Sequence, residues 1–191
     1  YYAVKLDRYD IFAEATANVH SGMLRFTYPE KEDAKIIMNF SRRIGGKADF
    51  EEIKIVNENT IEGKIICTPK GGGFGHGHGK IFYDFYFTCE LSQKPLKTQF
   101  FSNEEFQNEN LKEFSHEDVG LILDFGNSVT EPIILKCGVS YTSLEGARKN
   151  LKAEITDFDF DAQRKCSSDL WNEVFSIVDV EGSNETDLKL F

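Results

Sequence analysis

The sequence predicts a mainly β protein, an antiparallel β-sandwich followed by two α-helices. Hydrophobic and polar residues alternate with a period of two through most of residues 1–140, as they do in half-buried strands. Seventeen Phe and seven Tyr residues favour strands and a bulky core. After residue 141 the apolar residues recur at intervals of three or four, which is the spacing of an amphipathic helix.

The alternating segments predict ten strands. Several links between them are short and rich in Asn or Gly, which tolerate the left-handed conformation of tight turns, as at 18–22, 57–59 and 71–79. Short turns without intervening helices predict a sandwich. The acidic segment 102–118 is expected to be an exposed excursion between strands. The expected strands cover residues 2–6, 9–17, 23–28, 34–40, 51–57, 60–67, 80–91, 96–101, 119–125 and 131–141.

The expected strand 80–91 has one wholly apolar face. Tyr83 and Phe87 belong to this face, so we expect it to form core. The opposite face places Asp84 and Glu90 beside aromatic residues. That face is therefore expected to meet solvent or another domain.

Two helices are expected after the sandwich. Ser143 can cap the first and Asp159 the second, because Ser and Asp side chains accept hydrogen bonds from the free amides of a helix start. An aromatic-rich stripe such as that of the second helix needs a partner surface, which the sheet or a missing domain would supply. The stripes are Leu144, Ala147, Leu151 and Ile155 in the first helix, and Phe160, Leu170, Trp171, Val174, Phe175 and Val178 in the second.

The composition describes a globular protein with an acidic surface. Of 191 residues, 40% are hydrophobic and 28% charged, which fits one domain, or one domain and part of another. The formal net charge of -10 argues against nucleic acid and anionic membranes, since binders of phosphate need a positive surface. A neutral ligand such as a sugar remains compatible with this charge. The sequence contains neither a run of 18 apolar residues nor a signal-peptide pattern.

The four cysteines do not form a zinc-binding pattern, because no CxxC pair occurs. Cys67, Cys89 and Cys137 lie in apolar strand patterns, which favours buried free thiols. The even count, with Cys166, also permits disulfides. A domain of this size can bury enough core without them.

The stretch GGGFGHGHGK at 71–80 is the most unusual part of the sequence. It fails both glycine-rich phosphate-binding patterns, and it lies between two expected strands rather than before a helix. His76 and His78 project to one side if the loop is extended, so they could ligate zinc, but no third ligand is evident nearby. The alternatives are polar decoration of a hairpin tip and contact with a ligand or a neighbouring domain.

A second apparent metal motif is DFDFD at 157–161, which resembles the start of a calcium-binding EF-hand loop. The Gly and Glu that such a loop needs are replaced by Ala162 and Ser168. Acidic residues at a helix start, which the helix dipole favours, explain the motif better.

Arg25 carries a separate expectation. It lies on the more polar face of the strand 23–28, and we expect it to pair with an acid on a neighbouring strand or on the helical segment.

Three segments of the chain resemble glycoside hydrolase family 92. The first is AEATA at 13–17 with SGMLRFTYP at 21–29. The order and spacing of the segments match the family, so the resemblance extends over essentially the whole chain, although it is loose between 40 and 118. The second segment is VSYTS at 139–143 with Ala147, Arg148, Asn150, Leu151 and Glu154, and the third is DFDA at 159–162 with Arg164, Trp171, Asn172 and VEG at 180–182.

The resemblance implies a calcium-dependent exo-α-mannosidase of a mostly bacterial, exported family, secreted, periplasmic or at the cell surface. It implies a supersandwich like that of galactose mutarotase at 1–141, with N-terminal strands missing, and a helical linker at 142–178. Residues 179–191 would begin an (α/α)6 catalytic barrel. The implied reaction is an inverting hydrolysis of terminal α-mannosides, in which one carboxylic acid protonates the leaving oxygen and a carboxylate activates water.

The resemblance assigns no catalytic residue and no metal ligand to this chain, because the family's acid, base and most calcium ligands belong to the barrel. Calcium would be bound by the full-length enzyme and not by this chain. The loop before the aromatic strand can reach the pocket between the domains in this family. Phe74, His76 and His78 are therefore expected to border a cleft for mannose-containing glycans.

Two classes of function remain open from the sequence. The chain is either the sandwich domain of an exported α-mannosidase, inactive alone and partnered by the barrel, or a freestanding sugar-binding or structural sandwich. The chain ends inside an expected helix, which favours the first.

Overall fold

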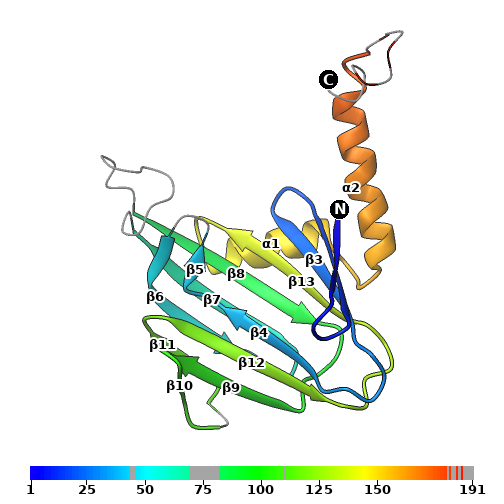
Figure 1. Cartoon of the computed structure of the whole chain (residues 1–191). Helices are drawn as coiled ribbons and strands as arrows, with labels where there is room; N and C mark the ends of the chain where they lie inside the picture. The colour runs from blue at the N-terminus through cyan, green and yellow to red at the C-terminus, as the bar shows by residue number, and fades with distance from the viewer. Residues whose placement is uncertain are drawn as a thin grey trace.

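The computed structural model describes residues 1–43, 46–68, 82–109, 111–179, 181, 184 and 186. These residues form two sheets and two helices (Figure 1). The elements are β1 (Tyr2–Leu6), β2 (Ile11–Ala17), β3 (Ser21–Thr27), β4 (Ala34–Asn39), β5 (Arg42–Arg43), β6 (Gly46–Ile55), β7 (Thr60–Cys67), β8 (Tyr83–Leu91), β9 (Lys97–Ser102), β10 (Glu105–Phe106), β11 (Glu113–His116), β12 (Val119–Gly126), β13 (Ile133–Ser140), α1 (Leu144–Glu154) and α2 (Phe160–Phe175).

The larger sheet has nine strands, in the order β1-β2-β3-β13-β8-β7-β6-β11 with β5 paired to β6, and the smaller has the order β10-β9-β12-β4. Every pairing in the described part of the chain is antiparallel. The predicted antiparallel sandwich followed by two helices is therefore confirmed. None of the described helices is long and apolar enough to cross a membrane.

The main core lies between the two sheets. Phe87 and Leu91 of β8 face Phe100 of β9 and Leu121 of β12, and all four side chains are buried. The apolar face predicted for the strand 80–91 thus contributes to the core, through Phe87, Cys89 and Leu91. A second, smaller core lies on the outer side of the large sheet, where Met23, Leu151, Ile155 and Phe160 join the strands to the helices.

Both helices begin at the predicted caps. The Ser143 hydroxyl accepts a hydrogen bond from the Gly146 amide, and the Asp159 carboxylate accepts one from the Ala162 amide. α1 packs across β13 and β8 on the outer face of the large sheet. α2 contacts β2 and β3 and rises away from the sandwich (Figure 1, orange). The polar face of β8, which was expected to meet solvent or another domain, therefore meets α1 of this same chain.

The acidic segment 102–118 is more ordered than the sequence suggested. It contains β10 and β11, and β11 extends the large sheet by pairing with β6. Only Phe114 of β11 packs on the core, where its ring lies 5.8 Å from that of Phe100. A short edge strand with one inward side chain carries almost no alternating signal, which explains why the pattern missed it.

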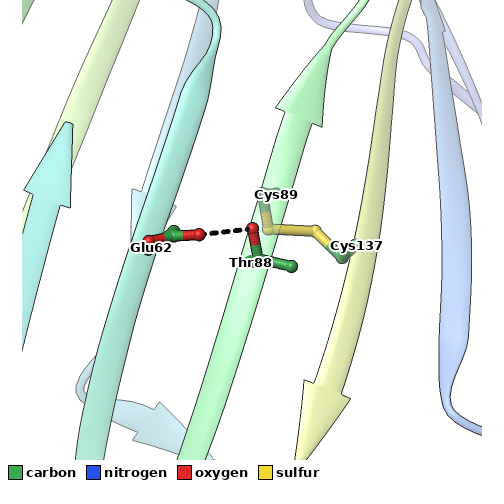
Figure 2. Close-up of a disulfide and its surroundings, with 4 residues drawn as sticks. All are labelled: Glu62, Thr88, Cys89 and Cys137. Atoms are coloured by element: carbon green, nitrogen blue, oxygen red, sulfur yellow. Dashed lines mark hydrogen bonds between the residues drawn. A yellow bond between two sulfur atoms is a disulfide. The ribbon is translucent and has the colours of Figure 1, made fainter. Parts of the chain in front are cut away.

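The expectation of free thiols is wrong for two of the cysteines. Cys89 of β8 and Cys137 of β13 lie directly opposite each other and form a disulfide, with their Cα atoms 4.2 Å apart (Figure 2). Cys67 is buried and free, as expected, and Cys166 is exposed and free. The register between strands 48 residues apart, which the sequence does not reveal, brings the two thiols together.

Candidate functional site

The three residues predicted to border a sugar cleft, Phe74, His76 and His78, lie outside the described residues. The strands on either side of them are described. β7 and β8 pair directly, with Cys67 opposite Tyr83 at the ends nearest to residues 69–81. The described part of the candidate site is therefore this end of the large sheet.

Aromatic side chains gather at this end of the sheet. The ring of Tyr141, which follows β13, meets the rings of Tyr83 and Phe85 edge-on at centroid distances of 5.8 and 5.5 Å. Tyr141 and Phe82 are both largely exposed. Such a cluster offers an apolar, ring-lined surface with polar tips, suited to a ligand with both apolar and hydroxyl faces.

A polar cluster lies on the outer face of the same strands. The Lys64 ammonium approaches the Asp84 carboxylate at 2.9 Å, and the Tyr86 hydroxyl donates to Asp84 at 3.2 Å. The hydrogen bond to Asp84 raises the pKa of Lys64. A cavity of about 620 Å³ beside the start of α1 is lined in part by Glu52, Lys64 and Tyr86. These groups can hydrogen-bond hydroxyl groups of a neutral ligand.

The acid with the catalytically suggestive environment is Glu51 on β6. Burial raises its pKa, as in many general acids, and its side chain is 0% exposed. One carboxylate oxygen accepts a hydrogen bond from the Val119 amide at 2.8 Å. Because the group faces the interior between the sheets, no substrate can reach it, and we regard it as structural.

Metal binding finds no support in the described residues. Across 1–43, 46–68, 82–109 and 111–179, no three His, Cys, Asp or Glu side chains gather as a metal site would require. The acidic run at 157–161 serves the helix start instead. Asp157 accepts from the Asp159 amide at 2.9 Å, and Asp161 binds Arg25.

Arg25 pairs with acids on both predicted partners. Its guanidinium donates to Glu14 of β2 at 2.5 and 2.8 Å and to Asp161 of α2 at 2.8 and 3.2 Å. It also lies over the Phe160 ring, 4.3 Å from the centroid. Hydrogen bonds to Glu14 and then Asp161 raise the pKa of Arg25 further above its usual value, while the Arg25 hydrogen bond lowers that of Glu14.

Arg148 fastens α1 to the sheet. Its guanidinium binds Glu62 of β7 with two hydrogen bonds, at 2.7 and 2.6 Å, and Thr88 donates to the same carboxylate at 3.1 Å (Figure 2). Glu62 is only 5% exposed, and the Arg148 hydrogen bond lowers its pKa. The sequence patterns assigned no role to Glu62, although a lone acid within the apolar strand 60–67 signals a buried partner.

Other residues of the resembling segments also attach helix to sheet. Asn150 donates to the Val139 carbonyl at 2.8 Å. Glu154 accepts from the Ser21 hydroxyl at 2.6 Å and from the His20 amide at 3.0 Å. These residues, which carry the resemblance, hold α1 against the large sheet.

The second half of α2 is exposed. Trp171 and Phe175 stack on each other with centroids 5.4 Å apart and are 58% and 64% exposed. The sandwich therefore does not cover the part of the predicted stripe that follows residue 169.

The comparisons with known proteins agree with this architecture. The family model described as "Glycosyl hydrolase family 92 N-terminal domain" matches residues 1–140, and the model of the family's catalytic domain matches 146–191. No curated protein matches the chain.

Solved structures of mannosidases resemble the whole chain. The family GH92 α-mannosidase BT3965 from Bacteroides thetaiotaomicron is 26% identical, with a TM-score of 0.82 over 95% of this chain and 24% of that one. The same enzyme in complex with mannoimidazole gives 27% identity and a TM-score of 0.79 over 92% of this chain and 22% of that one. The inverting mannosidase BT2199 from the same species shares the fold at 18% identity, with a TM-score of 0.79, over 96% of this chain and 23% of that one.

The chain spans about a quarter of the length of these structures. The N-terminal model covers nearly all of the sandwich, and its match ends where β13 ends. The chain therefore belongs to glycosyl hydrolase family 92.

Proposed function

We propose that this chain is the N-terminal sandwich, with the first helices, of an exported α-mannosidase that hydrolyses terminal α-mannosides with inversion. The observation that carries the proposal is the match of residues 146–191 to the family's catalytic domain, shortly after the match of residues 1–140 to its N-terminal domain. Further support comes from the 27% identical relative, which was solved with mannoimidazole.

The proposed reaction needs two carboxyl groups on opposite faces of the sugar, one to protonate the leaving oxygen and one to activate water. We assign neither to this chain. Among its well-paired acids, Glu62 and Glu154 hold α1 to the sheet, and Glu14 pairs with Arg25, which also binds Asp161 of α2. The catalytic acids and the (α/α)6 barrel that bears them belong to the remainder of the proposed enzyme.

The sandwich would contribute one wall of the substrate cleft. In this proposal Phe74, His76 and His78 contact the mannose-containing glycan, and the exposed residues Phe82 and Tyr141 lie near the end of β8 that is closest in sequence to them. Replacing the three loop residues by Ala should lower kcat/KM of the full-length enzyme at least about tenfold, the loss that ~1.4 kcal/mol of contact energy gives. An unchanged kcat/KM would remove the loop from the cleft.

Calcium dependence is proposed from the resemblance alone. The described residues do not fit a calcium site, since no three His, Cys, Asp or Glu side chains gather among them.

Export has one physical support, the Cys89–Cys137 disulfide, because such bonds persist mainly in oxidising compartments.

The product stereochemistry tests the proposed reaction. Proton NMR of the full-length gene product acting on p-nitrophenyl α-mannoside should detect β-mannose first, and a calcium chelator should abolish hydrolysis until calcium is restored. α-Mannose as the first product would contradict inversion. Failure to hydrolyse any α-mannoside would contradict the assignment as a whole.

A further inference from the structure

We propose that the second half of α2 is the surface on which the rest of the catalytic domain packs, and that α2 thereby joins the sandwich and that domain into one cooperative folding unit. The inference rests on the proposed function only in taking the full-length protein to contain a catalytic domain. It concerns a surface that the mannosidase assignment itself leaves undefined.

One face of α2 runs continuously from a buried half into an exposed half. The sandwich buries Phe160, Gln163 and Ser167. Continuing from Ser167 by steps of four and three residues leads to Trp171 and Val174, which lie on the same face because the steps match the helical repeat. This face is thus covered by β2 and β3 at its start and uncovered beyond Ser167.

The uncovered half, together with Ile177 and Val178 just after the helix, forms an exposed apolar patch. The stacked rings of Trp171 and Phe175 lie at its centre. Contiguous apolar patches of this kind mark interaction surfaces, whereas single exposed apolar residues need no explanation. The patch consists of Leu170, Trp171, Val174, Phe175, Ile177 and Val178, with exposed fractions of 47%, 58%, 55%, 64%, 82% and 59%.

The buried half of α2 is held firmly enough to stop the patch from folding back onto the sandwich. Asp161 binds Arg25 of β3 with two hydrogen bonds. Gln163 donates to the Asn18 side chain at 2.7 Å, and the Ser167 hydroxyl donates to the Ala17 carbonyl at 2.8 Å. Contacts in the first two turns fix the direction of the helix, so the patch needs an occupant beyond the sandwich.

The occupant to which we commit is the remainder of the catalytic domain. The catalytic-domain model matches 146–191, so α2 lies inside the sequence that this model describes. The chain covers only 24% of the length of the mannosidase it resembles at 26% identity, which leaves a large partner within the same kind of protein. Burial of the patch against that partner would give the two parts a shared core.

Hydrogen exchange of the full-length gene product tests this directly. The amides of residues 170–178 should exchange slowly in the wild type, because the covering domain must open before they exchange. In W171S/F175S their exchange should accelerate at least about 30-fold, because aromatic residues at the centre of an interface contribute most of its binding energy and these substitutions remove two of them. The single thermal transition of the wild type should also split into two.

The matched control is D169S/E173S, which introduces two Ser residues into the same helical segment at exposed polar positions. It should leave both the exchange and the single transition unchanged. Fast exchange throughout 170–178 in the wild type, or equal effects of the two double variants, would overturn the inference. Protection that depends on protein concentration, with the W171S/F175S variant turning a dimer into a monomer, would identify a second copy as the occupant and also overturn it.

The outcome is separable from that of the proposed function. A full-length protein that protects the patch but hydrolyses no α-mannoside would refute the proposed reaction and leave the coupling intact. A full-length protein that hydrolyses α-mannosides but leaves the patch unprotected would refute the coupling and leave the proposed reaction intact.

Discussion

Arg25 joins three parts of the molecule through one side chain. It binds Glu14 on the neighbouring strand and Asp161 on α2, and it covers the Phe160 ring in the second core. Glu14 is only 5% exposed, so it depends on this guanidinium for charge compensation. Tyr1 adds a hydrogen bond to the same carboxylate at 2.7 Å.

Arg25→Met should lower the free energy of unfolding by about 3 kcal/mol, because it leaves the Glu14 carboxylate buried without its partner. Urea unfolding of the 191-residue chain measures the loss. Lys165→Met is the control, since the ion pair of Lys165 with Asp169 is exposed and should contribute less than about 1 kcal/mol. Adding Glu14→Gln to Arg25→Met should recover part of the loss, and a double variant no more stable than the single one would contradict this account.

The same acids give the protein an acid-sensitive stability. Hydrogen bonds from Arg25 and Arg148 lower the folded-state pKa values of Glu14 and Glu62 below the ordinary value of 4.5. A depressed folded pKa contributes stability that is complete above the unfolded value and is lost as the pH falls through the folded one.

Stability should therefore be insensitive to these two groups from neutral pH down to about pH 5 and decline steeply below about pH 4. Unfolding curves across this range measure the decline. Glu62→Gln should flatten it, because Gln does not titrate. An equally steep decline in Glu62→Gln would exclude the Glu62–Arg148 pair as a cause.

At the scale of the elements, the contact of α1 with β13 positions everything that follows the sandwich. Gly138 of β13 lies directly under the helix. A Cβ atom there would stand 2.4 Å from the Ala147 carbonyl oxygen and 2.6 Å from the Leu151 Cβ. The helix can lie this close only because residue 138 has no side chain.

Gly138→Ala should force α1 away from the sheet and destabilise the chain by about 1–3 kcal/mol. Thermal unfolding followed by circular dichroism measures the effect. Gly22→Ala is the comparison in the same sheet, because its nearest neighbour, the Thr16 carbonyl oxygen, would be 3.2 Å away and can yield slightly. Equal losses of stability in the two variants would show that the close approach of α1 is not the reason why residue 138 must be glycine.

The disulfide is the second element-scale feature. Titration of the unfolded, unreduced chain should find two free thiols of four, those of Cys67 and Cys166, and only Cys166 should react in the folded state. Replacing Cys89 and Cys137 by Ala should reduce stability by about 2–4 kcal/mol, from the loop that the bond closes. Four reactive thiols in the unfolded chain would show that the bond does not form.

The sequence predicted the elements better than their partners. The alternation around residues 60–67 and the caps Ser143 and Asp159 are local signals, and the structure agrees with them. The disulfide between Cys89 and Cys137 depends on strand register. The hydrogen bonds between Arg148 and Glu62, 86 residues apart, depend on how α1 docks on the sheet. Local sequence patterns reveal neither. The strand β11 was missed because a single inward Phe114 gives no period.

At the scale of the whole molecule, the sandwich is a platform whose outer face carries two helices. Glu62, Glu154 and Arg25 fix those helices, and the fixed part of α2 directs its uncovered half away from the sheets. The candidate cleft residues Phe74, His76 and His78 remain predictions. Their chemistry could be proposed from sequence only through the family resemblance, because glycine-rich composition by itself fits a hairpin tip equally well.

The central claim is that this chain supports, but does not perform, the hydrolysis of α-mannosides. The most direct test measures mannose release from an α-mannoside by the purified 191-residue chain and by the full-length gene product, at equal molar concentration and with calcium present. We expect turnover by the full-length protein and none by the chain above a mock preparation, because the proposed mechanism assigns its two carboxyl groups to the barrel. Turnover by the 191-residue chain itself would contradict the account.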